Sequence, residues 1–94
     1  MKTIKKVEIE PVFVEFVPDV LEEGKIYISE LYKTSVHRCL CGCGGKVIMP
    51  IHPIHGWNLI KENNNKVSFI PSVGNYQLPC KSHYIITKNV ANFV

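Results

Sequence analysis

Short runs in which apolar and mixed positions alternate make up much of the chain. This pattern predicts β-strands, because successive side chains on a strand point to opposite faces. Residues 7–17 are rich in β-branched and aromatic residues, and Val12, Val14 and Phe16 fall on one face of such a strand. Pro11 and the nearby glutamates indicate an edge strand or a break, and Pro18 is expected to end the strand.

Further runs of this kind predict short strands over residues 25–29, 46–51, 57–60, 67–70, 84–87 and 90–94. Residues 63–65 are three asparagines, which accept left-handed backbone conformations, so residues 57–70 are expected to form a hairpin. Lys88 and Asn89 separate the last two strands. We predict an all-β fold, a compact sheet or sandwich of six or seven short strands with little helix, as a single domain over residues 1–94.

Two segments between the predicted strands carry most of the polar chemistry. The first is His37-Arg38-Cys39-Leu40-Cys41-Gly42-Cys43-Gly44-Gly45. We expect this segment to be extended from residue 34 onward, so that His37 and the three cysteines share one face and the glycines then let the backbone curl. The second segment, residues 71–75, reads Pro-Ser-Val-Gly-Asn and is expected to be a loop.

The length of 94 residues limits how much stability the core supplies. A domain of this size buries only about 60 to 65 per cent of its unfolded surface, so an additional stabilising element is expected. A structural Zn²⁺ supplies about 10 to 16 kcal/mol of apparent binding energy in small peptides. The N-terminus lacks the apolar core of a signal peptide, so we expect a cytoplasmic protein, in whose reducing compartment clustered cysteines bind metal rather than form disulfides.

The predicted zinc ligands are all four cysteines of the chain, Cys39, Cys41, Cys43 and Cys80. His37 and His83 are alternative ligands, and either can replace one thiolate. His83 is the stronger substitute, because it follows Cys80 by three positions. His52 and His55 lie beside Trp57 and are interpreted as loop histidines rather than as ligands, with Trp57 in the core.

The charge pattern argues against nucleic acid and membrane as partners. The formal net charge is +3, but the cations are scattered singly instead of clustering with aromatic residues. No apolar run is long enough to span a bilayer. The basic residues are therefore interpreted as solvated surface, with an acidic protein partner as the alternative.

Four blocks of the sequence, in order, resemble a family of small bacterial proteins. The blocks are His37-x-Cys39-x-Cys41-Gly42-Cys43-Gly44, Gly56-Trp57, residues 71–75, and Cys80-x-Ser82-His83-Tyr84. That family is associated with operons that encode ubiquitin-like proteins with their activating and conjugating enzymes. The resemblance implies that the protein processes or deconjugates a ubiquitin-like protein, its expected partner. The family pattern has proline at the position of Leu40, so the local loop geometry is expected to differ here.

For a peptidase, the nucleophile candidates are Ser72 and Ser82, which lie in the loop before Gly74 and beside His83. We predict that Ser72 is the nucleophile and His83 the general base, with Asn75 as oxyanion donor or orienting group. His37 is the alternative base. Two other hypotheses are an open metal site that activates water, which lacks an evident general base, and a non-catalytic zinc module that recognises its partner through a sheet edge.

Overall fold

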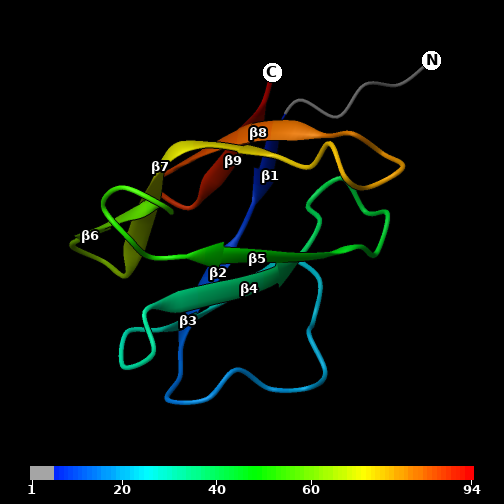
Figure 1. The fold of residues 1–94 in the computed structure, drawn as a ribbon. Helices are drawn as coiled ribbons and strands as arrows, with labels where there is room; N and C mark the ends of the chain where they lie inside the picture. Colours follow the sequence, from blue (N-terminus) through cyan, green and yellow to red (C-terminus); the bar gives the residue numbers. More distant parts are fainter. Residues whose placement is uncertain (1–5) are drawn as a thin grey trace.

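A computed structural model describes residues 6–94. The described chain forms nine strands in two sheets, seen as two layers in Figure 1. The five-stranded sheet has the order β1-β9-β8-β7-β6, and the four-stranded sheet the order β2-β3-β4-β5. The strands are β1 (Lys6–Glu8), β2 (Glu10–Phe13), β3 (Lys25–Ser29), β4 (Thr34–Arg38), β5 (Lys46–Pro50), β6 (Asn58–Glu62), β7 (Lys66–Gly74), β8 (His83–Thr87) and β9 (Val90–Phe93).

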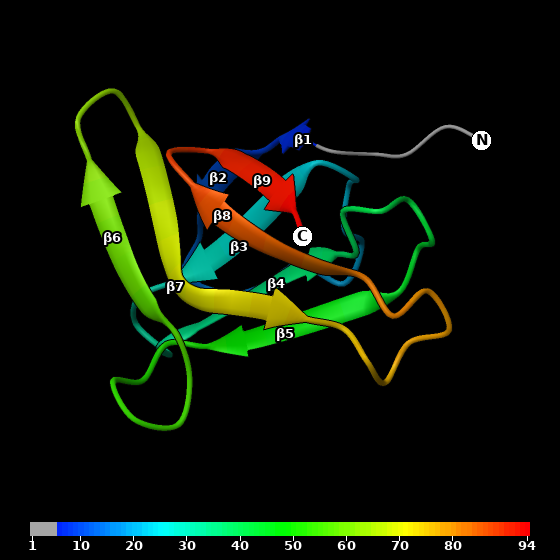
Figure 2. The same ribbon diagram turned by 90° about the horizontal axis from the view of Figure 1, so that it is seen from above.

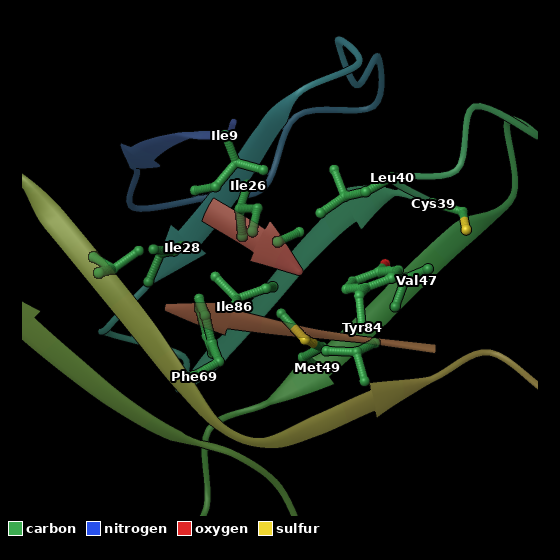
Figure 3. Close-up of a cluster of buried hydrophobic side chains, with 13 residues drawn as sticks. Ile9, Ile26, Ile28, Cys39, Leu40, Val47, Met49, Phe69, Tyr84 and Ile86 are labelled. Atoms are coloured by element: carbon green, nitrogen blue, oxygen red, sulfur yellow. The ribbon is translucent and has the colours of Figure 1, made fainter. Parts of the chain in front are cut away.

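The hydrophobic core lies between the two sheets. Phe69, Tyr84 and Ile86 of the larger sheet are fully buried against Ile26, Ile28 and Met49 of the smaller one. Figure 3 shows this cluster, with the sulfur of Cys39 at one end of it. The inward residues alternate with outward ones, as in β5, where Val47 and Met49 are buried and Ile48 is exposed. The predicted all-β class is therefore confirmed, and of the sheet and the sandwich it is the sandwich, with nine strands over the described residues instead of six or seven.

The N-terminal segment differs from the single strand expected over residues 7–17. It forms two strands in different sheets, because the chain crosses between the layers at the buried Ile9. The Ile9 N–H donates to Asn89 C=O, and the next N–H donates across to Gly24 C=O in the other layer. Pro11 lies in β2, the edge strand of its sheet, where a missing N–H costs little.

Two predicted turns lie between paired strands, and the asparagine turn has the left-handed backbone that its residues predict. Asn64 and Asn65 have φ of 66° and 57° in the hairpin between β6 and β7. Lys88 and Asn89, with φ of 48° and 65°, connect β8 and β9. Both pairs adopt the left-handed conformation of a tight hairpin turn.

Two other expectations for the backbone are wrong. The extended segment from Thr34 stops at Arg38, and Cys39, Cys41 and Cys43 lie in the loop that follows β4. The cysteines therefore do not share a strand face with His37. Their loop reverses the chain into β5, because the Cys39 N–H donates to Gly45 C=O at its base.

Residues 71–74 are not a loop but the second half of β7. Pairing with β8 shifts along this strand. Phe69 lies opposite Ile86 and Val73 lies opposite Tyr84, so residues 70–72 of β7 face only residue 85 of β8. The extra residues form a bulge, and Figure 2 shows β7 bending between the half that pairs with β6 and the half beside β8. Ser72 therefore lies on a bent strand, not on a free loop.

Across residues 6–94, the structure contains no helix with the length and apolar character needed to cross a membrane.

Candidate active site and cysteine cluster

Ser72 and His83 meet on adjacent strands of the larger sheet. The Ser72 Oγ atom lies 2.6 Å from Nε2 of His83, and both side chains are partly exposed. His83 begins β8 and is paired with Gly74, two residues beyond Ser72 on β7. The β7 bulge carries Ser72 beside this pair. A serine hydroxyl in contact with an imidazole nitrogen has the geometry in which histidine removes the hydroxyl proton.

Tyr76 contacts the opposite side of the same imidazole. Its hydroxyl oxygen lies 3.2 Å from Nδ1 of His83, and the ring centroids are 5.8 Å apart. When the Ser72 hydroxyl donates to Nε2, the proton of the neutral ring is on Nδ1 and is donated to the Tyr76 oxygen. This tautomer is assigned from the hydrogen bonds of the two ring nitrogens. The three side chains form a serine–histidine–tyrosine chain.

Gly74 makes room for Tyr76. A Cβ atom at position 74 would lie 2.6 Å from Cε2 of Tyr76, so any larger residue would displace the aromatic ring. Sequence reasoning missed Tyr76, although a side chain with a hydroxyl follows Asn75 directly. The sequence does not reveal the turn after β7, which brings the Tyr76 ring back over Gly74.

Trp57 holds the backbone of the nucleophile candidate. Its indole Nε1–H donates to the Ser72 C=O at 3.3 Å, and its main-chain N–H donates to Pro50 C=O on β5. The ring is partly buried against the core, as expected for this residue. Trp57 thus links the two sheets beside Ser72.

The four cysteines gather at one end of the sandwich. Their Sγ atoms all lie within 4.8 Å of one another, with Cys39 and Cys41 at 3.4 Å and Cys43 and Cys80 at 3.5 Å. Four thiolates around a zinc ion at 2.3 Å lie about 3.8 Å apart, so the set has the dimensions of a tetrahedral site. The four cysteines can therefore hold a metal ion.

The loop that carries three of these cysteines turns at glycine. Gly42 and Gly44 have φ of 91° and 84°, which favour glycine at both positions. Leu40 is 6 per cent exposed and belongs to the core cluster. Its side chain anchors the loop to the core.

Ser82 and Asn75 surround the cysteine cluster. The Ser82 Oγ atom lies 3.0 Å from Cys39 Sγ, and its hydrogen bonding lowers the pKa of the Cys80 thiol to about 6, which favours the ligand form. The Asn75 amide is 3.4 Å from Cys39 Sγ and 3.2 Å from both the Ser82 and Tyr84 hydroxyl oxygens. Neither residue is hydrogen-bonded to Ser72. The structure thus brings Asn75 and Ser82 to the cysteines and not to the Ser72 hydroxyl.

His37 lies in the core between the sheets. It is fully buried, and its Nε2 atom is 2.7 Å from the Tyr84 hydroxyl. Burial lowers its pKa to about 4, so the ring is neutral at pH 7. His37 contacts neither Ser72 nor the cysteine Sγ atoms through a hydrogen bond within the described chain.

Short backbone connections join the cysteine cluster to the Ser72–His83 pair. Asn75 and Ser82 contact the cysteines, and their chain neighbours Tyr76 and His83 contact each other. The Asn75 N–H also donates to Ser82 C=O at 2.8 Å. The geometry of the cluster therefore fixes the ends of the turn that presents Tyr76 to His83.

His52 and His55 form an exposed turn of their own. Their rings are stacked with centroids 5.1 Å apart, and His52 Nδ1 accepts the main-chain N–H groups of Ile54 and His55. This nitrogen completes the turn.

Comparison with known families matches residues 13–94 to the model of a family described as "Bacterial ubiquitination-like system serine protease (BubE)". The match spans every strand from β3 onward, including the cysteine loop, Ser72, Tyr76 and His83. No curated protein and no solved structure matches the chain.

Proposed function

Because the chain belongs to this family of bacterial ubiquitination-like system serine proteases, we propose that it cleaves a ubiquitin-like protein, from its precursor or from a conjugate, with Ser72 as nucleophile and His83 as general base. The observation that carries the assignment is the 2.6 Å separation of Ser72 Oγ and His83 Nε2. Ser82, the other serine considered, is hydrogen-bonded to the cysteine cluster instead.

The reaction follows acyl transfer through serine. His83 Nε2 takes the proton of the Ser72 hydroxyl as Oγ bonds to the carbonyl carbon of the scissile amide. The tetrahedral intermediate breaks its C–N bond, and the proton on Nε2 passes to the departing amine. Water then attacks the Ser72 ester, gives a proton to His83, and releases the carboxylate product as the serine regains its proton.

Tyr76 is the orienting partner of His83 in this proposal. Its oxygen accepts from Nδ1–H and so keeps the lone pair of Nε2 directed at Ser72. A tyrosine hydroxyl is neutral where serine proteases often use a carboxylate, so it stabilises the imidazolium that forms less strongly. The Tyr76 ring is held in this position by its close packing on Gly74 and by the turn at Asn75.

The Gly74 N–H is the oxyanion donor that we favour. The Asn75 N–H donates to the C=O of Ser82, the residue before β8, and alternation along an antiparallel strand directs the Gly74 N–H away from β8. β6 pairs with β7 only as far as Ile70, so no described strand covers Gly74 on that side. The donor is two residues from the nucleophile and part of a rigid strand, as transition-state stabilisation requires.

Asn75 and His37 receive structural roles in this proposal. The Asn75 amide is occupied by the Cys39, Ser82 and Tyr84 side chains, which supports the orienting role and not that of oxyanion donor. His37 is buried behind Tyr84, so His83 is the base.

Cys39, Cys41, Cys43 and Cys80 would hold Zn²⁺ in the protein. A bound zinc supplies a cross-link between the loop after β4 and the turn before β8. With all four thiolates as ligands, the site would be of the structural kind, and its role would be to stabilise the fold rather than to activate water. The chain's own residues, Asn75 and Ser82, then transmit the geometry of the cluster to Tyr76 and His83. We further propose that the protein acts in the cytoplasm, where free thiols persist for metal binding.

The test compares Ser72→Ala and Ser82→Ala proteins with wild type. Each is incubated with the ubiquitin-like precursor of the same system, and the products are read by intact mass. Ser72→Ala should abolish cleavage while metal content and melting temperature stay near wild type, and Ser82→Ala should still cleave when loaded with metal. Full cleavage by Ser72→Ala would remove Ser72 from the mechanism. Stable capture of the uncut precursor by wild type would favour a binding module.

A further inference from the structure

A groove of about 360 Å³ lies between the open edges of the two sheets. One wall is Lys46, Val47 and Ile48 of β5, and the other is Val73 and Gly74 of β7. Trp57 closes it at one place, and residues 75–78 line it as well. β5 and the second half of β7 belong to different layers (Figure 1), and they run alongside each other in Figure 2.

Within residues 6–94, the β5 wall presents main-chain groups that no other strand pairs with. The Cys39 N–H donates to Gly45 C=O, and the Ile51 N–H donates to Lys33 C=O, which fixes the alternation along the β4–β5 ladder. Val47 and Met49 therefore bond to β4, whereas the N–H and C=O of Lys46 and Ile48 point to the open edge. Pro50 has the same orientation, and its C=O accepts the Trp57 N–H at 2.8 Å.

The β7 wall presents unpaired groups of the same kind. The N–H and C=O of Gly74 point away from β8, as does the Ser72 C=O that accepts the Trp57 indole. Both walls of the groove are thus strand edges with outward-pointing main-chain groups, and the β7 wall includes Gly74, which lies opposite His83 in the β7–β8 ladder.

Trp57 demonstrates that one segment can bond to both walls. Its main chain pairs with β5, and its side chain donates to β7. Packed sheets lie about 10 Å apart and paired strands about 4.8 Å apart, so the gap between two edges has room for one added strand. Such a strand would connect the two edges by hydrogen bonds, as Trp57 does at its own position.

We propose that an extended segment of the substrate polypeptide lies in this groove as an added strand, with its main chain bonded to Ile48 on β5 and Gly74 on β7. The inference rests on the proposed function, because it is Ser72 that turns a bound strand into a cleaved one. Main-chain pairing on a sheet edge provides affinity for an extended peptide whatever its side chains. The carbonyl next to Gly74 would then lie near its N–H, which serves as oxyanion donor.

The charge of the groove adds a preference. Lys46 is the single charged residue among those that line it. A segment with an acidic side chain near Lys46 is therefore favoured over one with lysine or arginine there.

The test uses proline at position 48. Ile48→Pro removes the outward N–H of an edge strand, where proline is tolerated, and Ile48→Ala keeps the N–H while removing most of the side chain. Both changes are made in the Ser72→Ala background, and binding of the intact ubiquitin-like precursor is measured by calorimetry. We expect at least tenfold weaker binding for Ile48→Pro and a change within threefold for Ile48→Ala. Equal affinities for the two would overturn the added-strand proposal.

A second measurement needs no change in the groove. Hydrogen exchange of the Ser72→Ala protein should slow at the Ile48 and Gly74 amides when the precursor binds, and unchanged exchange at both would also overturn the proposal. This measurement tests the proposal even when the Ile48→Pro protein does not fold. The proposed function is tested separately, since it fails when Ser72→Ala still cleaves, whatever the affinities are.

Discussion

The Tyr76 hydroxyl lies 3.2 Å from Nδ1 of His83, on the side of the imidazole opposite Ser72. The contact joins an exposed turn residue to the first residue of β8, and it depends on a glycine below the aromatic ring. Because the Tyr76 hydroxyl is uncharged, it orients the His83 ring more than it stabilises a positive charge on that ring.

Tyr76→Phe should lower kcat about tenfold with little change in KM. The substitution removes one neutral hydrogen bond to the imidazole, worth about 1 to 1.5 kcal/mol, and leaves the ring in place. Steady-state cleavage of the ubiquitin-like precursor gives the two constants. Tyr32→Phe is the matched control, because Tyr32 is also exposed but packs against Phe16. An unchanged kcat in Tyr76→Phe would contradict the orienting role.

Gly74→Ala should impair cleavage through Tyr76. The φ of Gly74 is not positive, so alanine fits the backbone, but its Cβ meets the Tyr76 ring at 2.6 Å. We expect kcat to fall as far as in Tyr76→Ala while the melting temperature changes by only a few degrees. In the double variant Gly74→Ala with Tyr76→Ala, the two losses should not add, since both remove the same contact. Additive losses would show that Gly74 acts independently of Tyr76.

Cys80→Ser should remove most of the bound metal and lower the free energy of unfolding by several kcal/mol. The change leaves three thiolates around a site whose Sγ atoms all lie within 4.8 Å, and three thiolates hold zinc less tightly. Elemental analysis with thermal unfolding measures both effects, and we expect zinc at one equivalent in wild type.

A chelator titration of wild type extends this prediction. Activity and folded signal should disappear together, because the cluster is proposed to be structural. Loss of turnover while the fold persists would instead indicate a catalytic ion.

Asn75→Ala should destabilise the protein by about 1 to 3 kcal/mol and weaken metal retention. Asn75 is 7 per cent exposed, and the substitution removes the contacts of its amide with the Cys39 sulfur and with the Ser82 and Tyr84 hydroxyl oxygens. Denaturant unfolding measures the first effect and competition with a zinc indicator the second. The metal-loaded fraction should keep kcat within about tenfold of wild type, and a loss of a hundredfold or more would restore Asn75 as the oxyanion donor.

Much of the fold follows from local sequence. The alternation along β5 and the left-handed backbone at Asn64 and Asn65 each depend only on residues near in the chain. For these elements, the strand pattern and the backbone preferences of a few turn residues are sufficient. The grouping of the four cysteines as one metal site also follows from local sequence, because clustered cysteines in a small chain are typical of metal sites.

The path of the backbone around the site depended on distant partners. Residues 71–74 belong to β7 because Val73 and Gly74 pair with β8, and the bulge between Phe69 and Val73 has no signature in a stretch that also suits a turn. The cysteine loop leaves β4 at Arg38 because the sulfurs converge on Cys80, which follows Cys39 by 41 positions. A prediction from the alternation of side chains fails after Arg38, because it assumes that the strand continues.

The sequence by itself determined the all-β class, the hairpins and which residue types carry the chemistry. Only the tertiary structure decided the partners of each: Ser72 with His83, Tyr76 with the far nitrogen of the same ring, Asn75 with the cysteines, and His37 with Tyr84 in the core. The reason is physical. Residue types and short-range alternation are local properties, whereas a hydrogen bond between strands depends on register, and one bulge in β7 sets the register that places Ser72 beside His83.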